Sequence, residues 1–279
     1  MRKHLVPVIG LLLNLCAGSL LAAPVSLDGS EQWTLSSAEG REYRIMVSLP
    51  EGKVPYTGGY PVVYLLDGNA YFAAFHAAKR SQERLRGSIL IGIGYPSDTP
   101  LDFRRRSFDF SPPVPPARND PPQGGQDQFL DFIEHRLMPE VARRYQVDED
   151  QRSLVGHSFA GMFATYTLFT RPHLFQQLVA ISPSLWWHDH YLLAHEQAFT
   201  QQVREGRIKP LHNSLTLLMA ERDSAQEVQD AGALYRRLDA LSGFGLRSSF
   251  QVEAGEDHMS VPFRAASRVL EQLLKTRRF

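Results

Sequence analysis

A serine between small residues is the feature of this 279-residue chain that most directly indicates chemistry. Residues 156–160 read GHSFA; they follow the apolar run 153–155 and precede the helix-compatible segment 162–169. This layout predicts a sharp strand-to-helix turn with Ser158 at its tip, where bulky neighbours would collide with the strand and helix. Ala160 stands where the common pattern has glycine. A free hydroxyl is a poor nucleophile, so Ser158 requires a base.

A candidate acid and a candidate base follow the serine in a suitable order. Asp223 comes after the apolar run 215–220, and His258 lies in the segment 255–260, GEDHMS. A histidine can take the proton of a serine hydroxyl while a carboxylate orients the imidazole ring. Glu221 is the alternative acid because it follows the same apolar run. The pattern therefore predicts nucleophilic catalysis by Ser158 and His258, with Asp223 as the acid.

Alternating strands and helices must position these three residues. Long apolar runs are typical of strands buried on both faces of a sheet, and apolar stripes at helical spacing indicate helices. The alternation predicts an α/β protein with an α/β-hydrolase fold, in which helices cover both faces of a mostly parallel central sheet. We expect strands at 43–50, 61–67, 88–94, 152–156, 177–182, 215–220 and 248–253, and helices at 71–85, 126–145, 158–170, 226–242 and 260–275.

Two long connections interrupt this rhythm. Residues 96–125 are rich in Pro, Gly and Asp, and residues 186–210 are polar and compatible with helix. Both follow predicted strands, whose carboxyl ends form the edge at which ligands bind in open α/β sheets. We expect these connections to form the walls of an active-site cleft.

Charge and histidine spacing limit the classes of ligand. The chain has 30 Lys and Arg against 30 Asp and Glu, so no overall basic field favours a nucleic-acid partner. His188-Asp189-His190 and His195 resemble a metal cluster, but spacing alone is weak evidence for one. We therefore expect neither a metal nor a cofactor.

The N-terminus has the pattern of a secretory signal peptide. Arg2 and Lys3 precede the apolar stretch 5–15, and small residues occupy much of 19–24. That stretch is shorter than the roughly 20 residues that span a bilayer, so no stable membrane anchoring is expected. We assign 1–23 to the signal peptide and 24–279 to a single α/β-hydrolase domain in the periplasm. If Cys16 leaves with the signal, the mature chain has no cysteine.

Several motifs together give the chain a family resemblance. It resembles the putative-esterase family of α/β-hydrolases, and within that family the periplasmic siderophore esterases that cut the trilactones enterobactin and salmochelin. The resemblance covers nearly the whole mature chain. It is carried by residues 64–69 (YLLDGN), 92–96 (GIGYP), 105–109 (RRSFD), 156–161 (GHSFAG), 182–187 (SPSLWW) and 258–262 (HMSVP).

The resemblance implies a carboxylic ester hydrolase in which Ser158 and His258 match the catalytic serine and histidine. Some members are described as using a Ser-His dyad, which leaves the acid open. The oxyanion formed during acyl transfer requires preorganised donors, and the backbone N–H of Phe159 is expected to be one. The second is expected from the turn after 65–66, and the resemblance points to Asn69.

Four further residues are candidates for substrate binding. Arg105 and Arg106 lie in an expected cleft wall, and planar guanidinium donors suit a negatively charged ferric tris-catecholate. The alternative is a structural pair between an arginine and Asp109. Trp186 and Trp187 could stack on catechol rings. We expect one of these tryptophans in the core, because adjacent side chains after a strand diverge.

We therefore expect a periplasmic serine esterase that hydrolyses an enterobactin-like ferric trilactone and releases its iron. Two alternatives remain open: an esterase or thioesterase for other small acyl substrates, and a non-catalytic periplasmic siderophore-binding protein.

Overall fold

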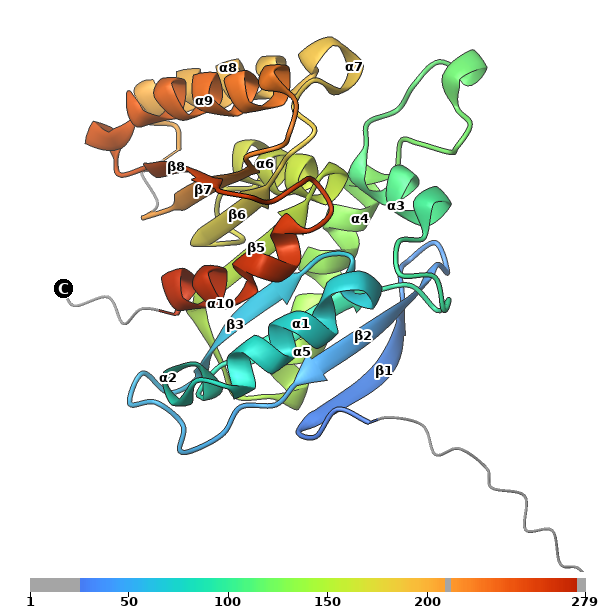
Figure 1. Cartoon of the computed structure of the whole chain (residues 1–279), viewed down its shortest axis with the longest axis vertical. Helices are drawn as coiled ribbons and strands as arrows, with labels where there is room; N and C mark the ends of the chain where they lie inside the picture. Colours follow the sequence, from blue (N-terminus) through green and yellow to red (C-terminus); the bar gives the residue numbers. More distant parts are fainter. Residues whose placement is uncertain (1–25, 209–211, 275–279) are drawn as a thin grey trace, which may run out of the picture.

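The computed structural model describes residues 26–208 and 212–274 of the chain. Eight strands form one sheet in the spatial order β1-β2-β4-β3-β5-β6-β7-β8 (Figure 1). β2 pairs antiparallel with β1 and β4, and the other neighbouring strands pair in parallel. The strands are β1 (Ser30–Ser36), β2 (Glu42–Ser48), β3 (Tyr60–Leu65), β4 (Ile89–Gly94), β5 (Val147–His157), β6 (Gln177–Ile181), β7 (Ser214–Ala220) and β8 (Arg247–Glu253).

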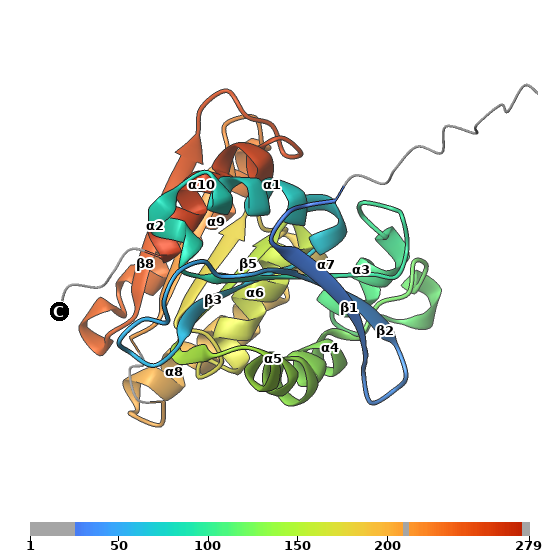
Figure 2. The same cartoon turned by 90° about the horizontal axis from the view of Figure 1, so that it is seen from below.

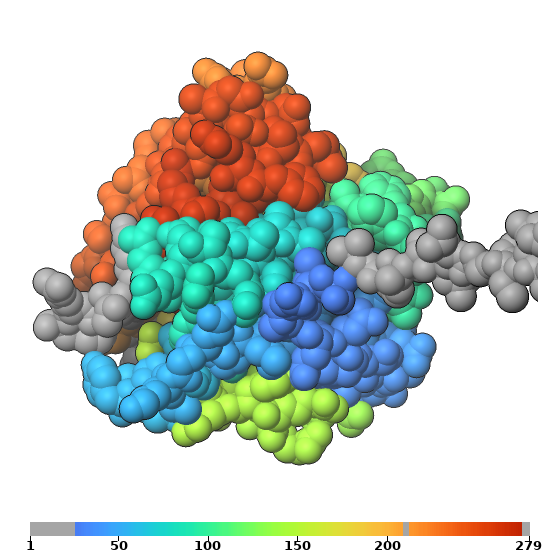
Figure 3. Space-filling view, turned by 60° about the horizontal axis from the view of Figure 1, so that its bottom comes forward, coloured from blue at the N-terminus to red at the C-terminus, as the bar shows by residue number. Residues whose placement is uncertain are grey.

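Helices cover both faces of the sheet, as Figure 2 shows. Successive side chains of β3 alternate between two cores: Val62 and Tyr64 belong to one, Val63 and Leu65 to the other. α1 (Gly68–Arg80) and α10 (Val261–Leu273) lie side by side over the second core (Figure 3). The first core holds residues from α3 (Phe103–Phe110), α4 (Gln126–Phe132), α5 (Met138–Arg144), α6 (Phe159–Thr170), α8 (Leu192–Arg204) and α9 (Ala225–Asp239).

The predicted α/β architecture is confirmed. α8 lies in the connection 186–210, which is compatible with helix, whereas β1 and α3 were not expected. β1 is an edge strand whose apolar positions are few, and its pairing with β2 defines it. α3 lies within the expected loop 96–125 and contains three consecutive arginines. Its start is set by Asp102, whose side chain accepts a hydrogen bond from the Arg105 N–H. Short elements complete the chain: α2 (Glu83–Arg86), η1 (Pro116–Arg118), η2 (Ile133–Leu137), α7 (Trp187–His190) and η3 (Ser242–Phe244).

The two long connections predicted as cleft walls contact each other. The ring of His188, after β6, lies 3.1 Å from the amide oxygen of Gln123, after β4. Nearby, the Tyr191 hydroxyl donates to the Gln126 amide oxygen at 3.0 Å. These hydrogen bonds join segments more than sixty residues apart, so the walls support each other above the carboxyl edge of the sheet.

The predicted signal peptide, residues 1–23, lies outside the described residues. Within 26–208 and 212–274, no helix has the length and apolar character required to cross a membrane.

Candidate active site

Ser158 occupies a strained turn between β5 and α6. Its φ of 60° and ψ of −117° are rarely adopted by a residue with a side chain. The turn requires glycine at 156, because a Cβ atom there would lie 2.2 Å from the carbonyl oxygen of Ala160. Ala160 is itself fully buried, so its methyl group fits where the common pattern has glycine. The sequence therefore builds the sharp turn that presents a serine nucleophile.

Asp223 and His258 form a hydrogen-bonded pair beyond the ends of β7 and β8. His258 Nδ1 lies 2.8 Å from Asp223 Oδ1. The other carboxylate oxygen accepts hydrogen bonds from the Ser182 hydroxyl at 2.5 Å and the Ala220 N–H at 2.8 Å. Glu221 instead accepts from the Gly255 N–H at the surface. The structure thus places Asp223, rather than Glu221, against the histidine.

The pair has the protonation pattern that a general base requires. Burial alone would raise the pKa of Asp223, but hydrogen bonds from His258, Ser182 and Ala220 lower it below its usual range. The hydrogen bond to Asp223 raises the pKa of His258, and burial opposes this rise. Because the carboxylate can only accept, we assign the proton of neutral His258 to Nδ1. This tautomer leaves Nε2 free to take a proton.

The nucleophile turn contacts the segment after β6 and the loop that carries His258. Its Oγ lies 3.3 Å from Ser184 Oγ, and its carbonyl accepts from the Ser184 N–H at 3.2 Å. The preceding residue, His157, has its ring centroid 4.7 Å from that of His258. The serine, the histidine and the acid therefore gather at one edge of the sheet.

The expected oxyanion donors lie at the starts of two helices. Phe159 is the first residue of α6, directly after the nucleophile. The side-chain amide of Asn69 donates to the carbonyls of Tyr95, Ser97 and Thr99 and accepts from the Tyr95 N–H. This side chain therefore organises the loop after β4. The backbone N–H of Asn69, in the first turn of α1, remains the group that can serve the oxyanion.

The three consecutive arginines have three different surroundings. Arg104 is exposed and pairs with Asp120. Arg105 is half-buried, donates to the Glu42 carbonyl at 2.9 Å and lies over the rings of Tyr43 and Tyr95.

Arg106 differs from the ligand-facing role expected of it. Its guanidinium is buried and makes a bidentate ion pair with Asp67. The structural alternative also needs correction, since the partner of Arg106 is Asp67, while Asp109 accepts from the Tyr43 hydroxyl. Burial raises the pKa of Asp109 to about 7, and nearby Arg105 opposes this rise.

The two tryptophans diverge as expected. Trp187 packs against the core, with its ring 4.5 Å from that of Phe159. Trp186 is exposed, and its indole N–H donates to Glu227 at 3.1 Å. Trp186 is therefore the one available to a ligand.

The histidines of the 188–195 segment have separate partners. His190 pairs with Asp230 at 2.9 Å, and His195 packs edge-on against the Tyr166 ring. Within the described part of the chain, no three His, Cys, Asp or Glu side chains form a group that could hold a metal ion.

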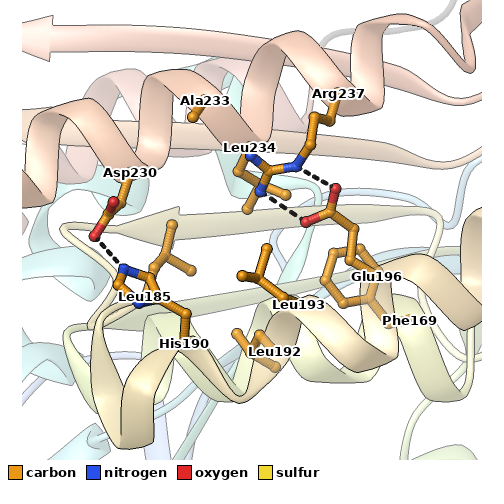
Figure 4. Close-up of a pocket in the computed structure, with 10 residues that line it drawn as sticks. All are labelled: Phe169, Leu185, His190, Leu192, Leu193, Glu196, Asp230, Ala233, Leu234 and Arg237. Carbon is orange, nitrogen blue, oxygen red and sulfur yellow. Dashed lines mark hydrogen bonds and ion pairs between the residues drawn. The ribbon is translucent and has the colours of Figure 1, made fainter.

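A cavity of about 200 Å³ lies between α8 and α9, and none of Ser158, Asp223 and His258 is among the residues that line it (Figure 4). Its wall is mainly apolar. Its polar side chains pair with each other across the gap: His190 with Asp230, and Arg237 with Glu196 through two hydrogen bonds of 2.6 and 2.8 Å. The cavity therefore offers little to an anionic substrate.

Comparison with known proteins agrees with this geometry. The family model described as Putative esterase matches residues 36–274. The chain belongs to this family. It is a serine esterase with an α/β-hydrolase fold.

Three similar proteins cover most of the chain. The Ferri-bacillibactin esterase BesA of Bacillus subtilis is 34% identical over 261 residues, which are 88% of this chain and 89% of that protein. The BES protein from Bacillus cereus has a TM-score of 0.81 at 30% identity, covering 91% of this chain and 99% of its own. The siderophore hydrolase EstB from Aspergillus nidulans has a TM-score of 0.75 at 30% identity, covering 92% and 99%.

Sequence reasoning gave no role to three polar residues near the site: Tyr71, His157 and Ser182. The Tyr71 hydroxyl lies 2.9 Å from His157 Nδ1, and Ser182 holds the acid. His157 was detectable, because it directly precedes the nucleophile. The partners of Tyr71 and Ser182 lie 86 and 41 residues away, so spacing carried no signal for them.

Proposed function

We propose that this esterase hydrolyses the ester bonds of a catecholate siderophore, an enterobactin-like ferric trilactone, and thereby releases its iron. The observation that carries the proposal is the serine site with an oriented histidine, in a chain similar along most of its length to an esterase named for ferri-bacillibactin. Other relatives are named as esterases of triacetylfusarinine C, enterobactin and apo-salmochelin.

Acylation uses the three residues in turn. His258 Nε2 takes the proton of Ser158 as Oγ attacks the lactone carbonyl, and the backbone N–H groups of Phe159 and Asn69 stabilise the oxyanion. The carbonyl–oxygen ester bond then breaks, and His258 returns the proton to the leaving alkoxide. Asp223 holds the ring and stabilises its charged form.

Deacylation repeats the chemistry with water. His258 takes a proton from the water, the resulting hydroxide attacks the acyl carbon, and Ser158 Oγ leaves with the proton. The product is a free carboxylic acid. Cutting the links between catechols lowers their effective concentration around the metal, which weakens the hold on the iron.

Two residues are suited to the substrate's aromatic arms. Trp186 presents an exposed ring that Glu227 fixes in place, so stacking on a catechol costs little ordering. Arg105 carries a positive charge at the wall of the cleft. A non-catalytic binding protein is not supported, because the chain belongs to an esterase family and retains the paired histidine and acid.

Product analysis tests the substrate directly. The enzyme is incubated with ferric and iron-free enterobactin, and products are identified by mass spectrometry, with Ser158→Ala as the matched control. Linear fragments from the wild type alone would support the proposal. If the enzyme hydrolyses p-nitrophenyl esters but leaves both forms of enterobactin intact, the proposal is wrong and the substrate is another small acyl compound.

The place of action is proposed to be the periplasm. The support is the signal-like pattern of residues 1–23. N-terminal sequencing of the periplasmic fraction should find a mature chain that begins near Ala23 or Pro24. A membrane-bound form that retains Met1 would contradict this.

A further inference from the structure

Arg106 joins three segments that surround the nucleophile. Its Nε and Nη2 donate to the two oxygens of Asp67 at 3.1 and 2.9 Å. Nη2 also donates to the carbonyl of His157, the residue before the nucleophile, at 3.3 Å. The guanidinium lies 5.7 Å from the ring centroid of Phe159, the residue after it. One side chain of α3 thus contacts both the turn after β3 and the nucleophile turn.

Asp67 is the residue from which α1 starts. Its backbone is left-handed, with φ of 52° and ψ of 45°, which is costly for a residue with a side chain. Its carbonyl accepts the N–H groups of Ala70 and Tyr71, which close the first turn of the helix. The orientation of this turn, and of the Asn69 N–H within it, therefore depends on how Asp67 is held.

A second link joins the same two segments. Tyr71, one turn into α1, has its hydroxyl 2.9 Å from His157 Nδ1. His157 is buried, and burial lowers its pKa to about 3, so the link is between neutral groups at neutral pH. The start of α1 is therefore tied to the nucleophile turn through both the carbonyl and the ring of His157.

Stability alone is a weak reason for the ion pair. Buried ion pairs can often be replaced by apolar residues of similar volume without loss of stability. The planar guanidinium of an arginine, however, binds two carboxylate oxygens in one fixed plane, and a lysine ammonium cannot do this. Such rigidity matters where two groups must stay at a set distance.

We infer that Arg106 is a positioning residue: it clamps Asp67 to the His157 carbonyl so that the N–H groups of Phe159 and Asn69 converge on the substrate's carbonyl oxygen. It acts through the backbone, without touching the substrate. The inference rests on the serine-esterase chemistry of the site and is independent of which siderophore is cut.

Arg106→Lys tests the clamp, with Arg104→Lys as a control. The same change at two nearby positions compares a buried, bidentate arginine with an exposed one. Turnover of p-nitrophenyl acetate gives kcat and KM, and phenylboronic acid reports the tetrahedral adduct that uses the oxyanion donors. We expect Arg106→Lys to lower kcat and boronate affinity each by roughly 10- to 100-fold, since small misplacements of donors are costly. KM should change by less than about 3-fold, and Arg104→Lys should match the wild type.

Asp67→Asn provides a second variant, because asparagine keeps the size of aspartate and tolerates left-handed backbone. It should show the same split between kcat and KM. Near-ultraviolet circular dichroism gives the folded fraction of each variant. Wild-type kcat per folded molecule in Arg106→Lys or Asp67→Asn, or failure of both variants to fold, would overturn the inference in favour of a purely structural pair. If the enzyme cuts p-nitrophenyl acetate but leaves enterobactin intact, the proposed substrate is wrong. The role of Arg106 is still tested in that case, because its test uses p-nitrophenyl acetate.

Discussion

Two buried carboxylates, Asp223 and Asp67, follow strands on opposite sides of β5, which carries the nucleophile turn, and each holds a different basic side chain. Asp223 follows β7 and holds His258, whose side chain is 33% exposed. Asp67 follows β3 and holds Arg106, whose side chain is 6% exposed. The His258 side chain is thus accessible to a substrate, while the pair of Arg106 and Asp67 is shielded from solvent.

The difference follows from what each basic side chain must do. In the proposed mechanism, His258 gains and loses a proton in every cycle, and an imidazole that titrates near neutral pH is suited to this. An arginine does not lose its proton in proteins, so Arg106 keeps its charge throughout the reaction. Burial alone would lower the pKa of Arg106, but Asp67 raises it above its usual value. In the proposed mechanism, the pair of His258 and Asp223 performs proton transfer, and the pair of Arg106 and Asp67 keeps its geometry fixed.

Removal of the nucleophile should have the largest effect. Ser158→Ala should lower turnover by on the order of 10⁶, because residues that act as a unit lose the covalent pathway together. Ligand binding should remain, measured by fluorescence titration with ferric enterobactin, since one hydroxyl is removed from the turn. More than a few percent residual hydrolysis would show that Ser158 is not the nucleophile.

Loss of the catalytic carboxylate should rank second. Asp223→Asn removes the acceptor that fixes the tautomer of His258, and such a change costs ~10⁴ in turnover in the serine-protease triad. Glu221→Gln, two residues away and at the surface, is the matched control and should cost little. Near wild-type kcat in both variants would mean that the enzyme works as a dyad of Ser158 and His258.

The pH profile of kcat/KM should test the pair of His258 and Asp223. His258 must be neutral to accept a proton, and Asp223 raises its pKa. The kcat/KM of the wild type should therefore rise with pH, with a midpoint above the pKa of an ordinary histidine. Asp223→Asn removes the hydrogen bond that raises the pKa of His258, while the burial that lowers this pKa remains. The rise of kcat/KM should therefore occur at lower pH in this variant. Measurement on a neutral ester between pH 5 and 9 checks this. If the rise of kcat/KM occurs at the same pH in both proteins, the group that titrates is not His258.

The smallest effect is expected from the half-buried arginine. Arg105→Gln should raise KM for the ferric siderophore a few-fold, with weaker salt dependence than the wild type, and spare a small neutral ester. Arg104→Gln is the control on the same helix. Equal losses on both substrates would instead assign Arg105 to support of Tyr43 and Tyr95, over whose rings it lies.

Much of the fold and the site was predictable from local patterns. The apolar runs identified seven of the eight strands that the structure describes, because burial on both faces of a sheet requires such runs. The small residues around Ser158 and the order of Ser158, Asp223 and His258 predicted the nucleophile and its base. β1 and α3 were missed, since β1 is defined by pairing with β2 and α3 begins at a cap among polar residues.

By itself, the sequence determined which residue types could react and in what order they occur along the chain. It favoured Asp223 as the acid but left Glu221 open, because both residues follow the same apolar run. It gave Arg105 and Arg106 the same role, because they are neighbours in one charged segment. Tertiary contacts decided both: Ser182 and His258, 41 and 35 residues away, hold Asp223, and Asp67, 39 residues away, holds Arg106. Hydrogen bonds in a buried site depend on which strands lie side by side, and strand order is a property of the folded sheet.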